Sequence, residues 1–453
     1  MSLLKLLSKR LKRILFTTPS HGQNPPPFKN ISNLKKFYRW DYSEIEGFDN
    51  LLDPKGAILM AQGKASDIFN TKKTFFLTQG STTGILAILK TVLNFKDKVL
   101  VARNCHKSVF SGLVLTGATV DWFMPDTKSE MCAKWGIMGE VNPEELKDAF
   151  KLNQYKAFIM TSPTYEGINS NIEEISKICK EFGVLLIVDE AHGALYNFSE
   201  LLPKTAIEQG ADFSVNSLHK NAGALNQCAL LHISKDCPYD WREVQNTINL
   251  FHTSSPSYPL VANIEASINF LSSKKGKKAI GQLITDIKNF QTALENEGFE
   301  FLKGDNKDIT KILLRLDNAD CSKLSDLLFE EYNIEDEISS AFSCLYLTGI
   351  GTNKGKLNKL KSALINAKNK KFDKIGIDKT LIPVFQPYPL VKLQPWEAYN
   401  RDYIYVQKEN APLMLSSEMI VPYPPGIGIL YPGEAIQQEH LEYLNDDAGV
   451  IKP

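Results

Sequence analysis

The sequence has neither an excess of charge nor a long hydrophobic run, and each absence narrows the range of functions. Its 453 residues include 52 lysines and arginines against 52 aspartates and glutamates, so the formal net charge is zero. Nucleic-acid binding needs a basic patch that this composition does not show, and we expect no nucleic-acid partner. No run of about 18 apolar residues is present, so we also expect no helix that spans a membrane.

Paired cysteines are missing as well. The seven cysteines are an odd number, and no two of them form a Cys-x-x-Cys pair. Such a distribution is typical neither of a disulfide framework nor of a zinc site. We therefore expect no bound metal and a cytoplasmic, reducing location.

The first residues are basic and amphipathic. Residues 3–16 carry lysines and arginines among leucines and contain no acidic residue. These charges interrupt what would be the apolar region of a signal peptide, and no small-residue cleavage site follows. We favour a helix that packs on the body or on a partner subunit, with a membrane-surface or transit helix as the alternative.

Short apolar segments alternate with amphipathic ones from about residue 55 onward. This alternation predicts a parallel sheet flanked by helices, in which ligands bind at the carboxyl ends of the strands. The predicted strands are residues 74–78, 98–103, 119–123, 157–161, 185–189, 213–216 and 229–233, and the predicted helices include 82–93, 143–150 and 173–182.

Changes in composition divide the chain into three predicted parts. Residues 1–36 would be an N-terminal helix and an arm rich in proline, asparagine and serine. Residues 37–271 would form the large α/β domain, and residues 272–453 a smaller α+β domain. The basic segment 272–278 is interpreted as a solvated loop between them, and the lysine-rich segment 366–379 as another exposed connection.

Polar residues follow several of the predicted strands. Gln79-Gly-Ser-Thr-Thr-Gly84 opens a predicted helix, where backbone N–H groups can bind a phosphate and Ser81 and Thr82 add hydroxyl donors. The same residues can also be simple helix caps. His106, at the end of another predicted strand, could lie flat on a planar cofactor ring or make ordinary hydrogen bonds.

The segment Leu185-Leu-Ile-Val-Asp-Glu-Ala-His-Gly193 places Asp189 at the end of a buried strand. A carboxylate there needs a cationic or hydrogen-bonding partner, and a protonated pyridine nitrogen would be one. Asp189, Glu190 and His192 could instead bind a metal. We favour this less, because neighbours on an extended strand point to different faces.

The last of these strands ends in Ser217-x-His219-Lys220. A lysine in this position could form the covalent bond that anchors pyridoxal phosphate (PLP). Ser217 and His219 could donate to its phosphate. A phosphate-binding turn, a ring-stacking histidine, a ring-nitrogen aspartate and an anchoring lysine occur in that order, which is far more specific than any one of them.

Together with further motifs, these residues resemble the ornithine/lysine/arginine decarboxylases, which are fold-type-I, aspartate-aminotransferase-like PLP enzymes. The resemblance is to the short form, without a receiver-like wing domain, and it is thinnest between residues 270 and 410. The motifs are Thr17-Thr-Pro-Ser-His-Gly22, Glu44-x-x-Gly-Phe-Asp-Asn-Leu51, Gln79-Gly-Ser-Thr-Thr83, Arg103-Asn-Cys-His-Lys-Ser108, Ser162-Pro-Thr-Tyr165, Asp189-Glu-Ala-His-Gly193, Ser217-x-His-Lys220, Thr253-Ser-Ser-Pro-Ser-Tyr258, Tyr423-Pro-Pro-Gly426 and Pro432-Gly-Glu434.

The resemblance implies a large α/β domain with a mixed, mostly parallel sheet, a smaller α+β C-terminal domain, and a homodimer or higher homo-oligomer. Lys220 would hold PLP, Asp189 would pair with its ring nitrogen and His106 would stack on the ring. The other residues implied to bind the cofactor are Gly80, Ser81, Thr82, His192, Ser217 and His219.

Three positions depart from the family pattern. Ser20 stands in Pro19-Ser20-His21 where a glycine is usual, Leu195 replaces a histidine, and Trp396 replaces an arginine before Glu397-Ala398. These departures bear on substrate choice and subunit contacts more than on PLP binding.

The predicted function is decarboxylation of lysine, ornithine or arginine to the corresponding amine and CO2. Another fold-type-I reaction, such as transamination or aldol cleavage, and a catalytically silent regulatory subunit are the alternatives. The distal cation of a basic substrate needs a carboxylate, since an unpaired buried charge costs several kcal/mol. Glu434 is the first candidate, with Glu337 and Glu166 as substitutes.

Overall fold

The coordinates are a computed structural model. The N-terminal motif Thr17-Thr-Pro-Ser-His-Gly22, most of the predicted arm and residues 423–425 of the Tyr-Pro-Pro-Gly motif lie outside the described residues. Within the described chain, no helix is long and apolar enough to cross a membrane. The structure describes residues 2–8, 35–45, 47–371, 375–376, 390–422 and 426–452.

The chain forms two compact units, Met1–Thr91 with Glu190–Gly281 and Val92–Asp189 with Gln282–Pro453. Sheet order is β1-β7-β6-β5-β4-β2-β3, with the first three strands in the first unit and the other four in the second. The mixed, mostly parallel sheet that we predicted is therefore confirmed. The three predicted domains stay a prediction.

In the first unit, strand β7 (Ala229–Ile233) runs antiparallel to both β1 (Lys73–Leu77) and β6 (Phe213–Ser217). Every residue of these three strands is buried, the polar Thr74, Asn216 and His232 included. The helices of this unit include α3 (Ala57–Ile68), α4 (Gly80–Val92), α9 (Leu218–Asn221), α10 (Trp241–Phe251) and α11 (Tyr258–Leu271).

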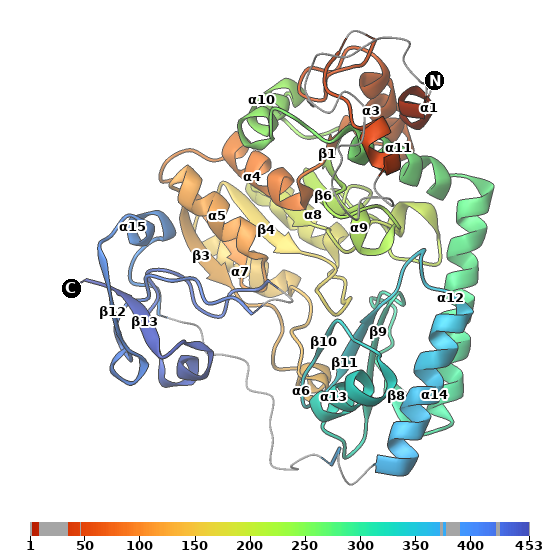
Figure 1. The fold of residues 1–453 in the computed structure, drawn as a ribbon. Coiled ribbons are helices and arrows are strands. Elements are labelled where there is room, and N and C mark those ends of the chain that lie inside the picture. Colours follow the sequence, from red (N-terminus) through yellow and green to blue (C-terminus); the bar gives the residue numbers. More distant parts are fainter. Residues whose placement is uncertain are drawn as a thin grey trace. The chain divides into compact units, whose positions relative to one another are not determined.

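The N-terminal helix α1 (Leu3–Ser8) packs on α11 in the same unit (Figure 1). Leu3 and Leu7 are buried, and the backbone N–H of Leu3 donates to the carboxylate of Glu265 at 2.6 Å. For this part of the basic stretch, the interpretation as a helix packed on the body is confirmed.

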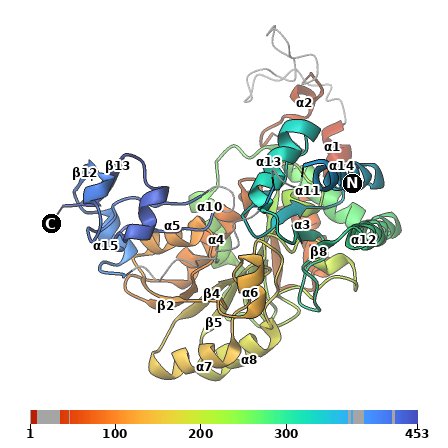
Figure 2. The same cartoon turned by 90° about the horizontal axis from the view of Figure 1, so that it is seen from below.

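The second unit holds the parallel strands β2 (Lys98–Ala102), β3 (Thr119–Phe123), β4 (Ala157–Thr161) and β5 (Leu185–Asp189). Strands β3, β4 and β5 have the predicted bounds. Helices α7 (Pro143–Leu152) and α8 (Ile172–Phe182) lie side by side against this sheet (Figure 2). Asn142 and Asn171 cap their N-termini through side-chain hydrogen bonds, so each helix starts where a good capping residue stands.

The second unit also contains a four-stranded antiparallel sheet, in the order β10-β11-β9-β8. Its helices share one hydrophobic core with it, which confirms the smaller α+β part (Figure 1). The elements are α12 (Lys274–Glu295), β8 (Phe299–Phe301), β9 (Lys311–Leu316), α13 (Cys321–Tyr332), β10 (Ile338–Ser339), β11 (Cys344–Leu347) and α14 (Lys354–Lys371).

Two predicted loops are wrong in part. Helix α12 begins at Lys274, within the basic segment 272–278, and the Ser273 hydroxyl accepts a hydrogen bond from the N–H of Gly276 at 3.1 Å. Helix α14 likewise continues through Lys371. Lysine has a good helix propensity, and we mistook the solvated face of each helix for a connection.

The last described residues form a small body of their own in the second unit. Strands β12 (Tyr403–Gln407) and β13 (Asp447–Ile451) pair antiparallel, and α15 (Pro395–Tyr399) precedes them. Leu430, Ile436 and Val450 contribute to its apolar core. The segment between these strands returns to the turn that follows β2, which matters for the site.

Candidate active site

The predicted phosphate-binding turn lies between β1 and α4 in the first unit. Gly80 adopts φ 79°, a left-handed conformation that favours glycine. Ser81, in the first turn of α4, accepts a hydrogen bond from the hydroxyl of Ser217 at 2.9 Å. Thr82 is exposed on the same turn. A helix N-terminus with two adjacent hydroxyl groups is suited to an anion.

The predicted anchoring lysine follows β6 on the single-turn helix α9. Lys220 is half-buried, and its Nζ atom lies 2.8 Å from Nε2 of the buried His192. Asn221 donates to the backbone carbonyl of His192 at 2.9 Å, which holds the two segments together. His219, between Ser217 and Lys220, hydrogen-bonds to the carbonyl of Cys228 at 3.2 Å.

The first unit therefore brings most of the predicted cofactor residues together. The Ser81–Ser217 pair and the Lys220–His192 pair are joined by the short stretch from Ser217 to Lys220. Because this places hydroxyl donors beside an amine and an imidazole, the donor set fits the phosphate and the aldehyde of PLP.

Asp189 and His106 belong to the second unit. Asp189 ends β5 with an exposed fraction of only 5%, and its carbonyl accepts from the N–H of Ser162 at 3.1 Å. His106 caps α5 (Lys107–Thr116): its Nδ1 accepts from the N–H of Ser108 at 3.2 Å and lies 2.9 Å from the Ser108 hydroxyl. A buried carboxylate and a fixed imidazole are the groups that a pyridine ring requires.

The carboxylate of Glu190 is held by hydrogen bonds within the protein. Its carboxylate accepts hydrogen bonds from the N–H of Ala206 at 2.7 Å and from the side chain of Asn216 at 3.1 Å. These two bonds account for a buried acid next to Asp189 without a ligand.

Glu434 is paired with a residue that sequence reasoning did not single out. Its Oε2 atom lies 2.9 Å from Nη2 of Arg103, and the side chains are 2% and 4% exposed. Burial raises the pKa of Glu434 to about 7, although Arg103 and the N–H of Tyr431 act in the opposite direction. The sequence feature that could have pointed to Arg103 is its place as the first residue of the motif Arg103-Asn-Cys-His-Lys-Ser108.

Glu337 lies in the α+β part, where it accepts a hydrogen bond from the hydroxyl of Tyr165. It is half-buried and is one of the residues that line a cavity of about 410 Å³ beside α14. Burial raises the pKa of the third candidate, Glu166, while Lys307 lowers it.

Two departures from the family pattern fill apolar space. Leu195 is fully buried in the first unit. The ring of Trp396 packs edge-on against Phe95 at 4.9 Å in the second.

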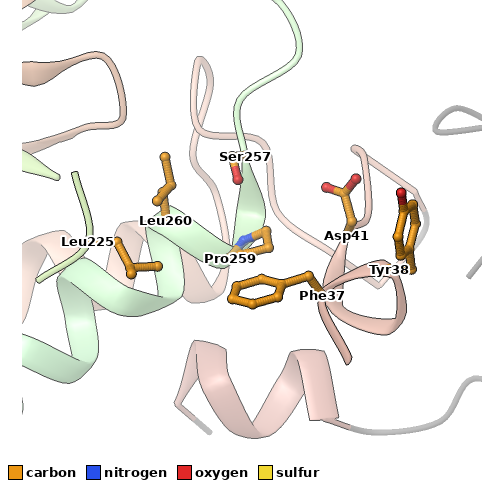
Figure 3. Close-up of a pocket in the computed structure, with 7 residues that line it drawn as sticks. All are labelled: Phe37, Tyr38, Asp41, Leu225, Ser257, Pro259 and Leu260. Carbon is orange, nitrogen blue, oxygen red and sulfur yellow. The ribbon is translucent and has the colours of Figure 1, made fainter. Parts of the chain in front are cut away.

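A further cavity of about 340 Å³ lies in the first unit, between α11 and helix α2 (Lys35–Trp40) (Figure 3). It is mostly apolar and contains none of the predicted site residues, so we assign it no part in the chemistry. It is lined by Phe37, Tyr38, Asp41, Leu225, Ser257, Pro259 and Leu260.

Comparison with known proteins identifies the same family that the sequence motifs resemble. The family described as Orn/Lys/Arg decarboxylase, major domain, matches residues 35–313, and its C-terminal domain matches residues 381–449. Arginine decarboxylase of Bacillus anthracis is 32% identical over 428 residues, covering 90% of this chain and 85% of that protein. Arginine decarboxylase of Halalkalibacterium halodurans is 30% identical and covers 90% and 84%.

Among solved structures, the lysine decarboxylase LdcF of Francisella novicida has a TM-score of 0.82 at 21% sequence identity. The match covers 99% of this chain and 80% of that one. At this identity the likeness shows the fold, which is that of the PLP fold-type-I enzymes.

Proposed function

Because the chain belongs to the Orn/Lys/Arg decarboxylase family and is therefore a PLP-dependent amino-acid decarboxylase, we propose that it converts arginine to agmatine and CO2 at a site anchored by Lys220. The observation that carries this assignment is the 2.8 Å contact between Lys220 and His192 beside the Ser81–Ser217 pair. Arginine is preferred over lysine and ornithine because similar relatives that match over most of their length are named arginine decarboxylase.

Each proposed role follows from the chemistry of the residue. Gly80, Ser81, Thr82, Ser217 and His219 bind the phosphate with N–H, O–H and imidazole donors. Lys220 forms the covalent bond to the cofactor, and His192 exchanges a proton with Nζ at hydrogen-bonding distance.

Two residues of the second unit act on the ring. Asp189 keeps a proton on the ring nitrogen, because a nearby negative charge favours the cationic form. His106 stacks on the ring and orients it. When bound, PLP supplies the electron sink for the pair of electrons that CO2 leaves behind.

The distal cation of the substrate needs a carboxylate, and Glu434 and Glu337 are the two main candidates. Glu434 already lies against Arg103, so its charge is compensated within the protein. Glu337 accepts a hydrogen bond from the uncharged Tyr165 hydroxyl and lines a cavity, which makes it our first choice. Glu337→Gln should raise KM for the basic substrate with less effect on kcat.

The test of the proposed function is CO2 release from purified protein loaded with PLP and given arginine, lysine or ornithine singly. We expect arginine to have the highest kcat/KM, by at least about tenfold, since a site that hydrogen-bonds the substrate rejects analogues that lack those groups. Release from lysine or ornithine alone would replace the substrate but keep the reaction. No release from any of the three would favour another fold-type-I reaction or a silent subunit.

We further propose a cytoplasmic location and assembly into at least a homodimer. Fold-type-I sites generally lie at a dimer interface, so PLP retention and activity should fall together when subunits separate. Light scattering at assay concentration measures this, and a fully active monomer would contradict it.

A further inference from the structure

The segment from Gly426 to Glu434 runs along the turn that carries His106, and both belong to the second unit. The N–H of Lys107 donates to the carbonyl of Gly426 at 2.9 Å. His106 and Ile427 form an antiparallel β-bridge. The turn before α5 is therefore held by backbone contacts from a segment more than 300 residues later in the sequence.

A buried ion pair anchors the same segment. Nη2 of Arg103 donates both to Oε2 of Glu434 at 2.9 Å and to the carbonyl of Ile429 at 3.1 Å. The same carboxylate oxygen accepts from the N–H of Tyr431 at 2.7 Å. Arg103 directly follows β2, so these bonds join the end of a sheet strand to the segment 426–434, called the returning segment below.

Aromatic rings fix the plane of the guanidinium group. It lies 4.4 Å from the ring centroid of Tyr431 and 4.9 Å from that of Trp122. The ring of Tyr431 also stacks on Phe110 of α5, with centroids 4.6 Å apart and planes 6° from parallel. The returning segment thus contacts α5 both at its first residue and one turn further on.

This arrangement is poorly explained by stability alone. A buried ion pair often contributes less than apolar residues of the same volume, because two charges must be desolvated. Within the part of the chain that the structure describes, Nη1 of Arg103 and Oε1 of Glu434 are buried without a hydrogen-bond partner. What the pair does provide is one defined geometry at the His106 turn.

We propose that Glu434 is a positioning residue: by holding Arg103 it fixes the segment 426–434 against the turn, and so sets the orientation of His106. This inference rests on the proposed stacking role of His106. It gives the carboxylate a partner inside the protein instead of the distal cation of the substrate.

The test compares Glu434→Ala and Glu434→Gln with Glu439→Gln, an exposed acid five positions away that serves as the matched control. The measurements on PLP-loaded protein are kcat, KM and the circular dichroism of the bound cofactor per mole of PLP. We expect Glu434→Ala to lower kcat by at least about tenfold with KM within about twofold, and to weaken the dichroism band. Glu434→Gln should lie between this variant and the control.

Two results would overturn the proposal. A raised KM with an unchanged kcat would show that Glu434 meets the substrate. A lower melting temperature with unchanged kcat and dichroism would show a structural role only.

If Glu434→Ala does not fold, Arg103→Lys keeps a cation opposite Glu434 but loses the planar donor group. It should give the same loss of kcat and dichroism, and normal values for both would again reject the proposal. Failure of the proposed function would look different, since wild-type protein would then release no CO2 or carry PLP on a lysine other than Lys220.

Discussion

The Lys220 cluster of the first unit (Ser81, His192, Ser217 and Lys220) and the Arg103–Glu434 pair of the second unit differ in how far their polar side chains are buried. Lys220 and Ser81 are half-buried, so each keeps part of its surface exposed while it contacts His192 or Ser217. Arg103 and Glu434 are almost fully buried, and each faces the charge of the other. Partly exposed polar groups at strand ends can contact a ligand. A buried ion pair is already satisfied within the protein, and its effect is to hold the segments that carry it in place.

The largest expected effect comes from removing the side-chain amine of Lys220. Lys220→Ala should abolish decarboxylation and covalent PLP attachment, because it removes the amine that lies 2.8 Å from His192. Borohydride reduction followed by peptide mapping measures the attachment, with the exposed Lys204→Ala as control. PLP fixed to a different lysine in the wild-type protein would reject the assignment.

The next effect separates chemistry from binding in the second unit. Asp189→Asn keeps the shape of a side chain that is 5% exposed but removes its charge. We expect PLP to stay bound while the rate falls by several orders of magnitude, each factor of ten corresponding to about 1.4 kcal/mol of barrier. Absorbance of the bound cofactor and CO2 release are the two readouts, and near-normal turnover would make Asp189 structural.

A smaller effect, on stability, tests whether Glu434 is charged in its contact with Arg103. The pKa of Glu434 is raised by burial from its usual 4.5 to about 7, so the folded protein binds this proton more tightly than the unfolded chain. The free energy of unfolding should then fall as pH rises from about 4.5 to 7, by at most about 3 kcal/mol, and level off above that range.

Glu434→Gln cannot titrate and should lack this part of the pH slope. Urea unfolding of the two proteins at a series of pH values gives the comparison. Identical slopes would mean that the carboxylate is charged throughout the range and that Arg103 outweighs burial.

The smallest effect tests the turn that we propose to bind the phosphate of PLP. Ser81→Ala and Ser217→Ala each remove one hydroxyl of a pair 2.9 Å apart. A hydrogen bond to a charged group contributes about 1.5–3 kcal/mol, so each variant should weaken PLP binding by at least about tenfold. Titration of the apoprotein with PLP measures the affinity, and exposed Ser255→Ala is the control.

Much of the large sheet was predictable from sequence in both units, because the apolar segment that marks each strand is a local feature. Strand β7 has the bounds expected from its apolar run, and the turn at Gly80 follows from its residue types. Lys220 and His192 lie 28 positions apart, within one strand–loop–strand repeat of the chain. The site roles themselves stay predictions until they are measured.

The Arg103–Glu434 pair could not be predicted in the same way. Its partners are 331 positions apart, and neither residue belongs to a periodic pattern that points to the other. Glu434 was expected to meet a substrate cation, since nothing in its sequence neighbourhood showed that Arg103 would lie against it. Long-range pairing of this kind is decided by packing, which local patterns do not encode.

The return of the segment 426–434 to the His106 turn also sets an order of events during synthesis. Met1–Thr91 and Glu190–Gly281 complete the first unit, with Lys220 and Ser81 in it, long before Gly426 leaves the ribosome. The backbone contacts between the His106 turn and the segment 426–434 can form only after Gly426 has been made, and such distant contacts form late and slowly. A nascent chain should therefore fold the region around Lys220 before the orientation of His106 is fixed, so a site that needs both residues would become complete only after the segment 426–434 has been made.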